Sequence, residues 1–311
     1  MFLKRKHPID YGRAKVRQEI LIRQRRELWT PEQVKSLACH FRLRPGKSLL
    51  DVGCGFGYAL RTWGRYCLPG GTLVGLDRDR RLLSTAKRLC WREGLADCSE
   101  FVQGDVYTLP FSANRFHTTL AHVVFCHLDK PERALDEMIR VTRRGGCVVV
   151  FDNALGDGMP TGWYSWSKPT VRQLLLDYEF NLRWQRGRRK LGRGDMSVGC
   201  YIPGWMEARD MRDVGVRMNE RVRWMAPPYR SPEQRTQRQS ALERNRERVR
   251  WDRLDKREKE LVKAGGLSRR KYLRREARAR VLHRAWRKEL RDRTASFAGS
   301  SPFWCIWGFK P

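Results

Sequence analysis

The sequence predicts an α/β protein in which helices cover both faces of a mostly parallel sheet. Three observations support this fold class: an apolar segment that ends in a glycine-rich turn, further apolar segments that end in polar residues, and helical patterns between them. Strands that alternate with helices are typical of parallel sheets. The chain has 311 residues, of which 41% are hydrophobic, and this is enough for such a core and for additional elements.

The first predicted strand and its turn occupy residues 49–57, with the sequence LLDVGCGFG, and a helix begins in residues 58–63. Glycine tolerates positive φ angles and lets a ligand approach the backbone, and a helix start presents free N–H groups. A strand, a Gly-x-Gly-x-Gly turn and a helix together predict a binding site for a nucleotide-type cofactor. Because glycine-rich turns also arise from packing alone, this prediction depends on the strands that follow.

The later strands end in polar residues at positions that suit a cofactor. Asp77 ends the second strand, at the distance where α/β domains place a carboxylate for ribose hydroxyls. Asp105 ends the third strand and His122 ends the fourth. Because the carboxyl ends of parallel strands share one edge of the sheet, we expect the cofactor there. The later strands are predicted over residues 71–77, 100–106, 116–122 and 147–153, and helices between them over residues 81–93 and 131–141.

Four segments carry a family resemblance: DVGCGFG (51–57), LDRD (76–79), GDVYTLPF (104–111) and HLDKPERALDEMIRVTRRGG (127–146). In this order they resemble the class I S-adenosylmethionine-dependent methyltransferases, and most of all the small-molecule group that includes ubiquinone/menaquinone-biosynthesis methyltransferase-like proteins. The resemblance covers residues 49–153. It implies a Rossmann-like seven-stranded methyltransferase sheet with N-terminal helices and a helical insertion before the last strand. It also implies that S-adenosyl-L-methionine is the cofactor and that a small molecule accepts the methyl group.

The resemblance also implies a role for individual residues. Asp77 would bind the two ribose hydroxyls, and His122 would lie beside the sulfonium and the acceptor. The methionine part of the cofactor would lie against Asp51, Gly53 and Gly55, and the adenine against Asp105 and Val106. The predicted cofactor site further includes Cys54, Gly57 and Arg78.

Two details bear on the choice of family. The loop Arg143-Arg144-Gly145-Gly146 stands where such proteins often carry Arg-Pro-Gly-Gly, but this loop only leads into the fifth strand. A nicotinamide-dependent dehydrogenase is the main competing interpretation. Its fingerprint usually lacks an acid directly before the glycines, where this chain has Asp51. A methyltransferase is therefore favoured.

Methyl transfer from a sulfonium is an in-line displacement in which the cofactor carries the reactive group and the protein supplies orientation. Near-attack geometry contributes about 7–11 kcal/mol, so a dedicated nucleophile is not required. A general base helps when the acceptor is a hydroxyl or an acidic carbon. The candidate catalytic residues are His122, His127 and Asp152. For His127, a role as a helix-entry residue is the competing interpretation.

The chain is expected to divide into four regions. Residues 1–45 are predicted to form an N-terminal helical cover, in which Thr30 caps a helix. Residues 46–226 are expected to form the S-adenosylmethionine-binding methyltransferase core. Residues 227–297 are expected to form a basic helical cap over the substrate cleft. Residues 298–311 would return to the core sheet as its final strand.

Further local predictions concern the second half of the chain. The aromatic loop at residues 156–166 is predicted to bind the acceptor, and the competing interpretation is that its rings fill the core. A helix is expected over residues 168–183, and a half-buried antiparallel strand over residues 214–224. The tetrad Ala226-Pro227-Pro228-Tyr229 is similar to a motif of methyltransferases that act on adenine or glutamine. It begins with Ala226 and lies far downstream, so we interpret it as a turn without a catalytic role.

The formal net charge of +31 is uneven, because residues 161–311 hold 38 basic and 17 acidic side chains. Such an excess favours acidic partners, so nucleic acid or an anionic surface is a candidate partner of the basic C-terminal helices. An arginine-rich composition with solvated helix faces is the competing interpretation. The charge keeps two alternative functions open: an RNA or protein methyltransferase, and a non-catalytic cofactor-binding protein.

The nine cysteines include no Cys-x-x-Cys pair, so the sequence predicts neither a disulfide framework nor a metal site. This cysteine usage favours a reducing compartment, and we expect a cytoplasmic protein. The sequence has no apolar run of the length that spans a membrane. It does not predict the oligomeric state.

Overall fold

The computed structural model forms two compact units, and each is described by itself. Unit 1 contains Met1–Ala154, Arg193–Arg221 and Phe303–Pro311, and unit 2 contains Leu155–Gly192 and Val222–Pro302. The structure describes residues 28–154, 162–164, 170–248, 256–299 and 302–311.

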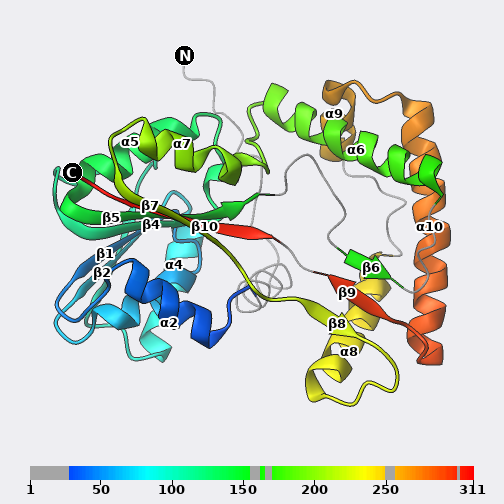
Figure 1. Ribbon diagram of the computed structural model, residues 1–311, viewed down its shortest axis with the longest axis horizontal. Helices are drawn as coiled ribbons and strands as arrows, with labels where there is room; N and C mark the ends of the chain where they lie inside the picture. Colours follow the sequence, from blue (N-terminus) through cyan, green and yellow to red (C-terminus); the bar gives the residue numbers. More distant parts are fainter. Residues whose placement is uncertain (1–27, 155–161, 165–169, 249–255, 300–301) are drawn as a thin grey trace. The chain divides into compact units, whose positions relative to one another are not determined.

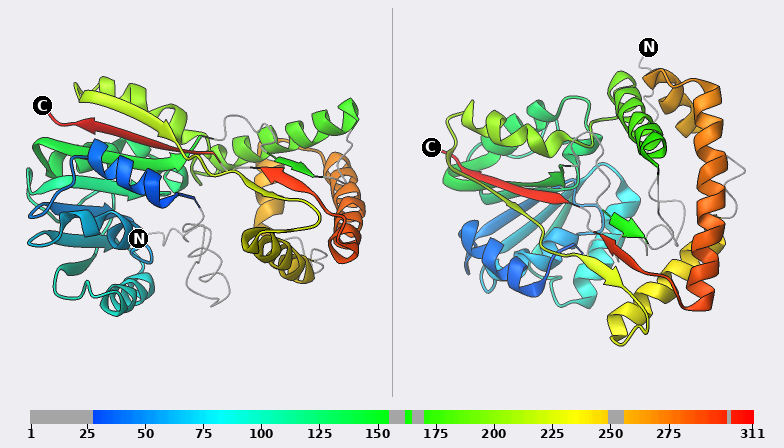
Figure 2. Two further views of the ribbon diagram at one scale, coloured as in Figure 1. Left: turned by 60° about the horizontal axis from the view of Figure 1, so that its bottom comes forward. Right: turned by 45° about the vertical axis from the view of Figure 1, so that its right-hand side comes forward.

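Unit 1 contains a seven-stranded sheet with the order β3-β2-β1-β4-β5-β10-β7 (Figure 1). The first five strands in this order are parallel, whereas β10 is antiparallel to both of its neighbours. In both views of Figure 2, β10 is the long red strand that ends near the C-terminus. The predicted Rossmann-like seven-stranded sheet is thus confirmed. The strands are β1 (Ser48–Val52), β2 (Thr72–Asp77), β3 (Ser99–Gln103), β4 (Phe116–His122), β5 (Thr142–Asn153), β7 (Arg212–Met218) and β10 (Phe303–Phe309).

Capping side chains mark the start of two helices of unit 1. At the start of α2 (Pro31–His40), the Thr30 hydroxyl accepts a hydrogen bond from the Gln33 backbone N–H. At the start of α4 (Arg80–Arg92), the Asp79 carboxylate does the same for the backbone N–H of the second helical residue. Figure 1 shows α5 and α7 on one face of the sheet and α2 on the other. The other helices that the structure describes in unit 1 are α3 (Tyr58–Thr62), η1 (Gly64–Cys67), η2 (Phe125–His127), α5 (Pro131–Val141), η3 (Val198–Cys200) and α7 (Ile202–Glu207).

Both faces of the sheet are buried, and β5 shows how the sequence achieves this. Val148 and Val150 pack in the hydrophobic cluster that also contains helix α5. Val149 and Phe151, which alternate with them, pack in the opposite cluster together with Leu37 of α2. An apolar run with side chains on both sides is what a central strand covered by helices requires.

Unit 2 contains helices and a small antiparallel sheet with the order β6-β9-β8. The strands are β6 (Gly162–Tyr164), β8 (Arg223–Met225) and β9 (Phe297–Gly299). Each has only three residues, so none shows a period-two pattern that sequence reasoning could detect. The helices that the structure describes in unit 2 are α6 (Val171–Lys190), α8 (Pro232–Arg248), α9 (Lys256–Gly265) and α10 (Arg269–Asp292).

Charged and aromatic side chains join the helices of unit 2. Arg278 of α10 donates a hydrogen bond to the Asp177 carboxylate of α6 at 2.6 Å. The guanidinium of Arg275 lies 3.6 Å from the ring centroid of Phe180. A side chain on Gly187 would collide with the backbone of α9, so glycine lets α6 and α9 approach closely. These contacts explain why α6 belongs to unit 2.

Some predicted boundaries differ from the structure. The strand expected over residues 214–224 splits into β7 and β8. At the break, the Asn219 backbone N–H donates to the Phe303 carbonyl at 3.0 Å and its Oδ1 accepts from the Phe303 N–H at 2.8 Å. The loop expected over residues 156–166 contains β6. The helix expected over residues 168–183 continues to Lys190.

Several predictions concern residues outside the part that the structure describes. These are the helical pattern in residues 10–27, the loop residues 156–161, 165 and 166, and the apolar positions within residues 249–255. For the N-terminal cover, the structure therefore describes α2 and the residues next to it.

Candidate functional site

The glycine-rich turn joins β1 to α3 and holds three residues in the left-handed backbone region. The φ angles are +72° at Gly53, +53° at Gly55 and +68° at Gly57, which caps α3. A Cβ on Gly53 would also lie 2.7 Å from Val124 Cγ2. Glycine is required at this position because it tolerates both the backbone conformation and the close packing.

Two predicted cofactor residues lie beneath this turn. Asp51 is 1% exposed in β1 and pairs with Gly75 of β2. Cys54 is buried, and its backbone N–H donates to the Leu76 carbonyl at 2.8 Å. A Cβ on Gly75 would lie 3.0 Å from the Cys54 sulfur, so the thiol packs closely against β2. Cys54 thus contributes as a small apolar side chain that supports the turn.

The Asp77 carboxylate lies directly beside the glycine turn. The Gly55 N–H donates to its Oδ2 at 2.9 Å, and the Asp79 N–H donates to its Oδ1 at 2.9 Å. Each carboxylate oxygen can accept a second hydrogen bond, so the group suits two adjacent hydroxyls such as those of a ribose. The residues present therefore fit the cofactor that the resemblance implies. Binding of the ribose by Asp77 itself stays a prediction.

Three further predicted residues lie at the same edge of the sheet. Asp105 and Val106 follow β3, and Asp105 Oδ1 accepts a hydrogen bond from the Tyr107 N–H at 2.9 Å. Arg78, at the end of β2, interacts electrostatically with Asp105. The Tyr107 hydroxyl donates to Asp129 at 2.6 Å. Burial and this hydrogen bond raise the pKa of Tyr107 to about 12, so it remains a hydrogen-bond donor at neutral pH.

His122 ends β4 inside a group of aromatic rings. It is 4% exposed, and its Nε2 accepts a hydrogen bond from Trp29 Nε1–H at 3.3 Å. Its ring centroid lies 5.2 Å from that of Tyr58, 6.0 Å from that of Trp63 and 5.3 Å from that of Phe151. Because Nε2 accepts a hydrogen bond, the proton of the neutral ring lies on Nδ1. The ring is therefore held in one orientation beside the glycine turn.

Sequence reasoning did not assign Trp29, Trp63 or Phe151 to the site. Trp63 and Phe151 stack with their centroids 4.4 Å apart, and Trp29 packs edge-on against both. The one available signal was the position of Trp29 directly before the predicted helix cap. Nothing in its spacing connects Trp29 with His122, so only the fold brings the two together.

Asp152 and His127 occupy different environments. Asp152 has no exposed surface; its Oδ2 accepts from the Cys126 N–H at 3.1 Å and its Oδ1 from the Asn153 N–H at 2.7 Å. Burial raises the pKa of Asp152, although these hydrogen bonds act in the opposite direction. Asp152 thus fixes the segment after β4. His127 is half-buried at the end of η2, where its N–H donates to the Val124 carbonyl at 2.9 Å. A catalytic role for either residue stays a prediction.

Comparison with known sequences finds methyltransferases that are similar to the segment holding the glycine turn and Asp77. Residues 50–150 match a family model described as a methyltransferase domain. Cycloartenol-C-24-methyltransferase 1 of Oryza sativa subsp. japonica is 31% identical over 121 residues, which are 39% of this chain and 35% of that protein. Cycloartenol-C-24-methyltransferase of Arabidopsis thaliana is 29% identical over 189 residues, which are 54% of this chain and 53% of that protein. The chain thus spans about half or less of the length of these curated relatives.

Comparison with solved structures agrees on the fold. A protein of Bacillus halodurans C-125 that is described as a methyltransferase superposes with a TM-score of 0.50 at 14% identity. The match covers 90% of this chain and 99% of that chain. Fold and site together define a cofactor-binding α/β protein. The domain match then identifies residues 50–150 as a methyltransferase domain.

A membrane-spanning helix, a metal centre or a set of disulfide bonds would suggest other functions. Within the residues that the structure describes, no helix has the length and apolar character needed to cross a membrane. In the same residues, no group of three or more His, Cys, Asp or Glu side chains is arranged to hold a metal ion. All nine cysteines are free thiols.

Proposed function

We propose that this chain transfers the methyl group of S-adenosylmethionine to a small-molecule acceptor. The observation that carries this proposal is the Asp77 carboxylate, fixed by the Gly55 N–H beside the glycine turn within the matched domain. The bound cofactor would supply an electrophilic methyl group on a sulfonium, which the acceptor attacks in line. Holding donor and acceptor in this geometry contributes about 7–11 kcal/mol.

In this proposal the protein binds and orients the cofactor. Asp77 holds the ribose hydroxyls, and Asp105 and Val106 border the adenine. The left-handed turn at Gly53 and Gly55 lets the backbone approach the amino-acid part of the cofactor. Because these groups are already fixed by backbone hydrogen bonds, binding requires little reorganisation of the site.

The candidate catalytic residues take different roles in this proposal. His122 is a fixed wall beside the methyl group, since its Nε2 is already engaged by Trp29. Asp152 is enclosed and positions the segment after β4. His127 is the best candidate to accept a proton from a hydroxyl acceptor, because this residue is only half-buried.

The acceptor class is also part of the proposal. The two curated relatives above are named for cycloartenol, so a sterol-type lipid is the first acceptor to assay. Nucleic acid is the second candidate, because unit 2 has 32 basic and 13 acidic side chains. Some of these basic side chains form ion pairs within unit 2: Lys271 pairs with Glu179 and Arg278 with Asp177. We therefore favour a small molecule. A cytoplasmic location stays a prediction.

Turnover of labelled cofactor tests the proposal in three arms: cycloartenol in detergent micelles, a metabolite extract freed of nucleic acid, and total RNA. We expect label in the lipid or extract arm, in a product heavier by one CH₂. Label only in RNA would support the second candidate instead. Asp77→Ala should abolish both turnover and cofactor binding measured by calorimetry. Asp97→Ala removes an exposed carboxylate before β3 and should behave as wild type. Wild-type cofactor affinity in Asp77→Ala would contradict the assigned site.

A further inference from the structure

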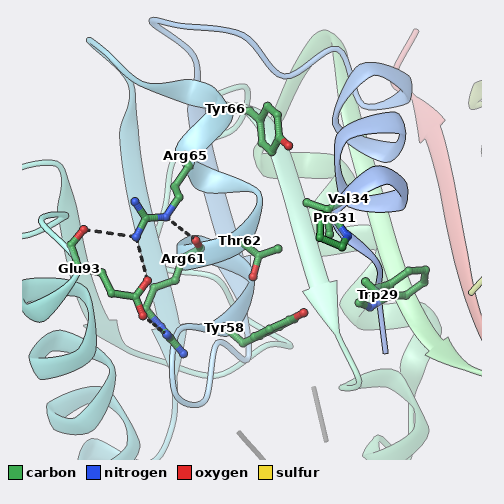
Figure 3. A pocket seen from close by; sticks show the side chains of 9 residues that line it. All are labelled: Trp29, Pro31, Val34, Tyr58, Arg61, Thr62, Arg65, Tyr66 and Glu93. Carbon is green, nitrogen blue, oxygen red and sulfur yellow. Dashed lines mark hydrogen bonds and ion pairs between the residues drawn. The ribbon is translucent and has the colours of Figure 1, made fainter. Parts of the chain in front are cut away.

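A cavity of about 490 Å³ in unit 1 has no role in the function proposed above. It lies between α2 and the α3–η1 segment, and the end of α4 forms part of its rim (Figure 3). Pockets of this volume are typical for small organic ligands. One side of the cavity is aromatic and apolar, whereas the other is charged, so the lining itself indicates the kind of ligand.

The charged side consists of two arginines that share one carboxylate. Arg61 Nη1 donates to Glu93 Oε1, and Arg65 Nη2 donates to Glu93 Oε2 at 2.8 Å (Figure 3). Burial alone would raise the pKa of Glu93, but the hydrogen bonds and charges of Arg65 and Arg61 outweigh it and lower the pKa. Glu93 is therefore ionised at neutral pH, and the three groups together keep one positive charge.

Arg61 is the least satisfied member of this group. Its side chain is 4% exposed, yet its Nε and Nη2 have no hydrogen-bond partner among the residues that the structure describes. Buried N–H groups of a cation without partners are costly in free energy. An anion in the cavity would bind the exposed guanidinium of Arg65 and balance the remaining charge.

The apolar side consists of flat surfaces from two segments. Tyr58, Thr62 and Tyr66 follow one another along the α3–η1 segment. Trp29 and Val34 line the cavity from the side of α2 (Figure 3). Aromatic side chains of this kind pack well against a planar apolar ligand.

We propose that this cavity binds a small organic anion. Its planar apolar body packs against Trp29, Tyr58 and Tyr66, and its carboxylate or phosphate binds Arg65, next to the Arg61–Glu93 ion pair. Asp77, to which the proposed function assigns the ribose, is not among the residues that line the cavity. The cavity is connected to the cofactor site through Trp29 and Tyr58, which also contact His122.

Titration calorimetry on the full chain tests this proposal with three probes: 2-naphthoate, 2-naphthyl phosphate and the neutral 2-naphthylmethanol. We expect saturable binding of at least one anion, and about tenfold weaker binding of the alcohol. The preference between the two anions identifies carboxylate or phosphate as the bound group. Arg65→Gln should weaken anion binding about tenfold, because it removes a charge-assisted hydrogen bond. Arg88→Gln removes the same charge from an exposed position on α4 outside the cavity and should leave the affinity unchanged.

Arg65 is the position chosen for the variant because its side chain is 47% exposed. A substitution of the buried Arg61 would also disturb the packing of unit 1. Tyr66→Ala should weaken the binding of both the anions and the alcohol. The absence of saturable binding of either anion would overturn the proposal, as would equal affinities in wild type and Arg65→Gln. Asp77→Ala should retain anion binding, so a failure of the cofactor assignment can be distinguished from a failure of this proposal.

Discussion

Unit 1 and unit 2 are stabilised by different kinds of interaction. In unit 1, aliphatic side chains such as Val149 and Val150 are fully buried on the two faces of the sheet. In unit 2 the buried clusters are smaller, and ion pairs such as that of Arg278 with Asp177 join the helices. A basic side chain in unit 2 can therefore have a structural role, and the net charge of the chain alone is weak evidence for a nucleic-acid partner.

The largest expected effect concerns the core of unit 2. Leu290 has no exposed surface and packs with Met225 and Trp286. Leu290→Ala should lower the free energy of unfolding of unit 2 by about 2–5 kcal/mol, because it leaves a cavity. Hydrogen exchange should become faster in α8 and α10, while the affinity for S-adenosylmethionine remains within about twofold of wild type.

The matched control is Leu273→Ala on the same helix, where the side chain is 46% exposed and little free energy should be lost. Loss of cofactor binding in Leu290→Ala would contradict this prediction, since it would show that the methyltransferase domain depends on the core of unit 2.

A second prediction concerns the backbone of unit 1. Gly55→Val places a β-branched residue at a φ of +53° and disturbs the N–H that holds Asp77. We expect the affinity for S-adenosylmethionine to fall by at least about 100-fold, or roughly 2.7 kcal/mol. Calorimetry measures this loss. Gly145→Val is the control for backbone strain, because Gly145 has a φ of +69° and open space around its Cα. Equal cofactor affinity in the two variants would refute the role of the turn.

The smallest predicted effect concerns an ion pair in unit 1. Glu137 accepts hydrogen bonds from the Leu109 N–H at 2.7 Å and from Arg140 Nε at 2.7 Å. The bond to Arg140 lowers the pKa of Glu137 against the opposing effect of burial. Because the folded-state pKa is lowered, the stabilisation is present at neutral pH. It is lost as the pH falls below the ordinary value of about 4.3 and through the folded-state pKa.

Glu137→Gln should therefore lower the free energy of unfolding by about 1 kcal/mol at pH 7. The difference from wild type should shrink as the solution approaches about pH 3. Denaturant titration at both pH values measures it. Glu207→Gln, at an exposed position on α7, serves as the control. A difference that stays constant with pH would show that the ionised carboxylate does not provide this stabilisation.

The sequence allows prediction of the parallel part of unit 1 because local and long-range signals agree there. The apolar strands end in Asp77 and His122, and α4 and α5 lie within two residues of their predicted positions. The glycine turn was predictable because its backbone conformation requires particular residues. The approach of Gly55 to Asp77 follows from the parallel pairing of β1 with β2.

The other features of the site and of unit 2 depend on contacts that leave no periodic pattern in the sequence. The hydrogen bond from Trp29 to His122 joins residues 93 positions apart. The charged side of the cavity joins Arg61 of α3 to Glu93 at the end of α4, and neither residue belongs to a recognisable motif. The short strands of unit 2 form by pairing with one another, so tertiary context rather than propensity determines them.

The position of β10 has a consequence for how the protein is made. β10 lies between β5 and β7 in the sheet, although it follows both of them in the chain. During translation, residues 222–302 therefore leave the ribosome while β5 still presents an unpaired edge. Unpaired edges of incomplete sheets associate readily with other chains. We therefore expect elongation rate and chaperone supply to determine how much nascent chain reaches the native state.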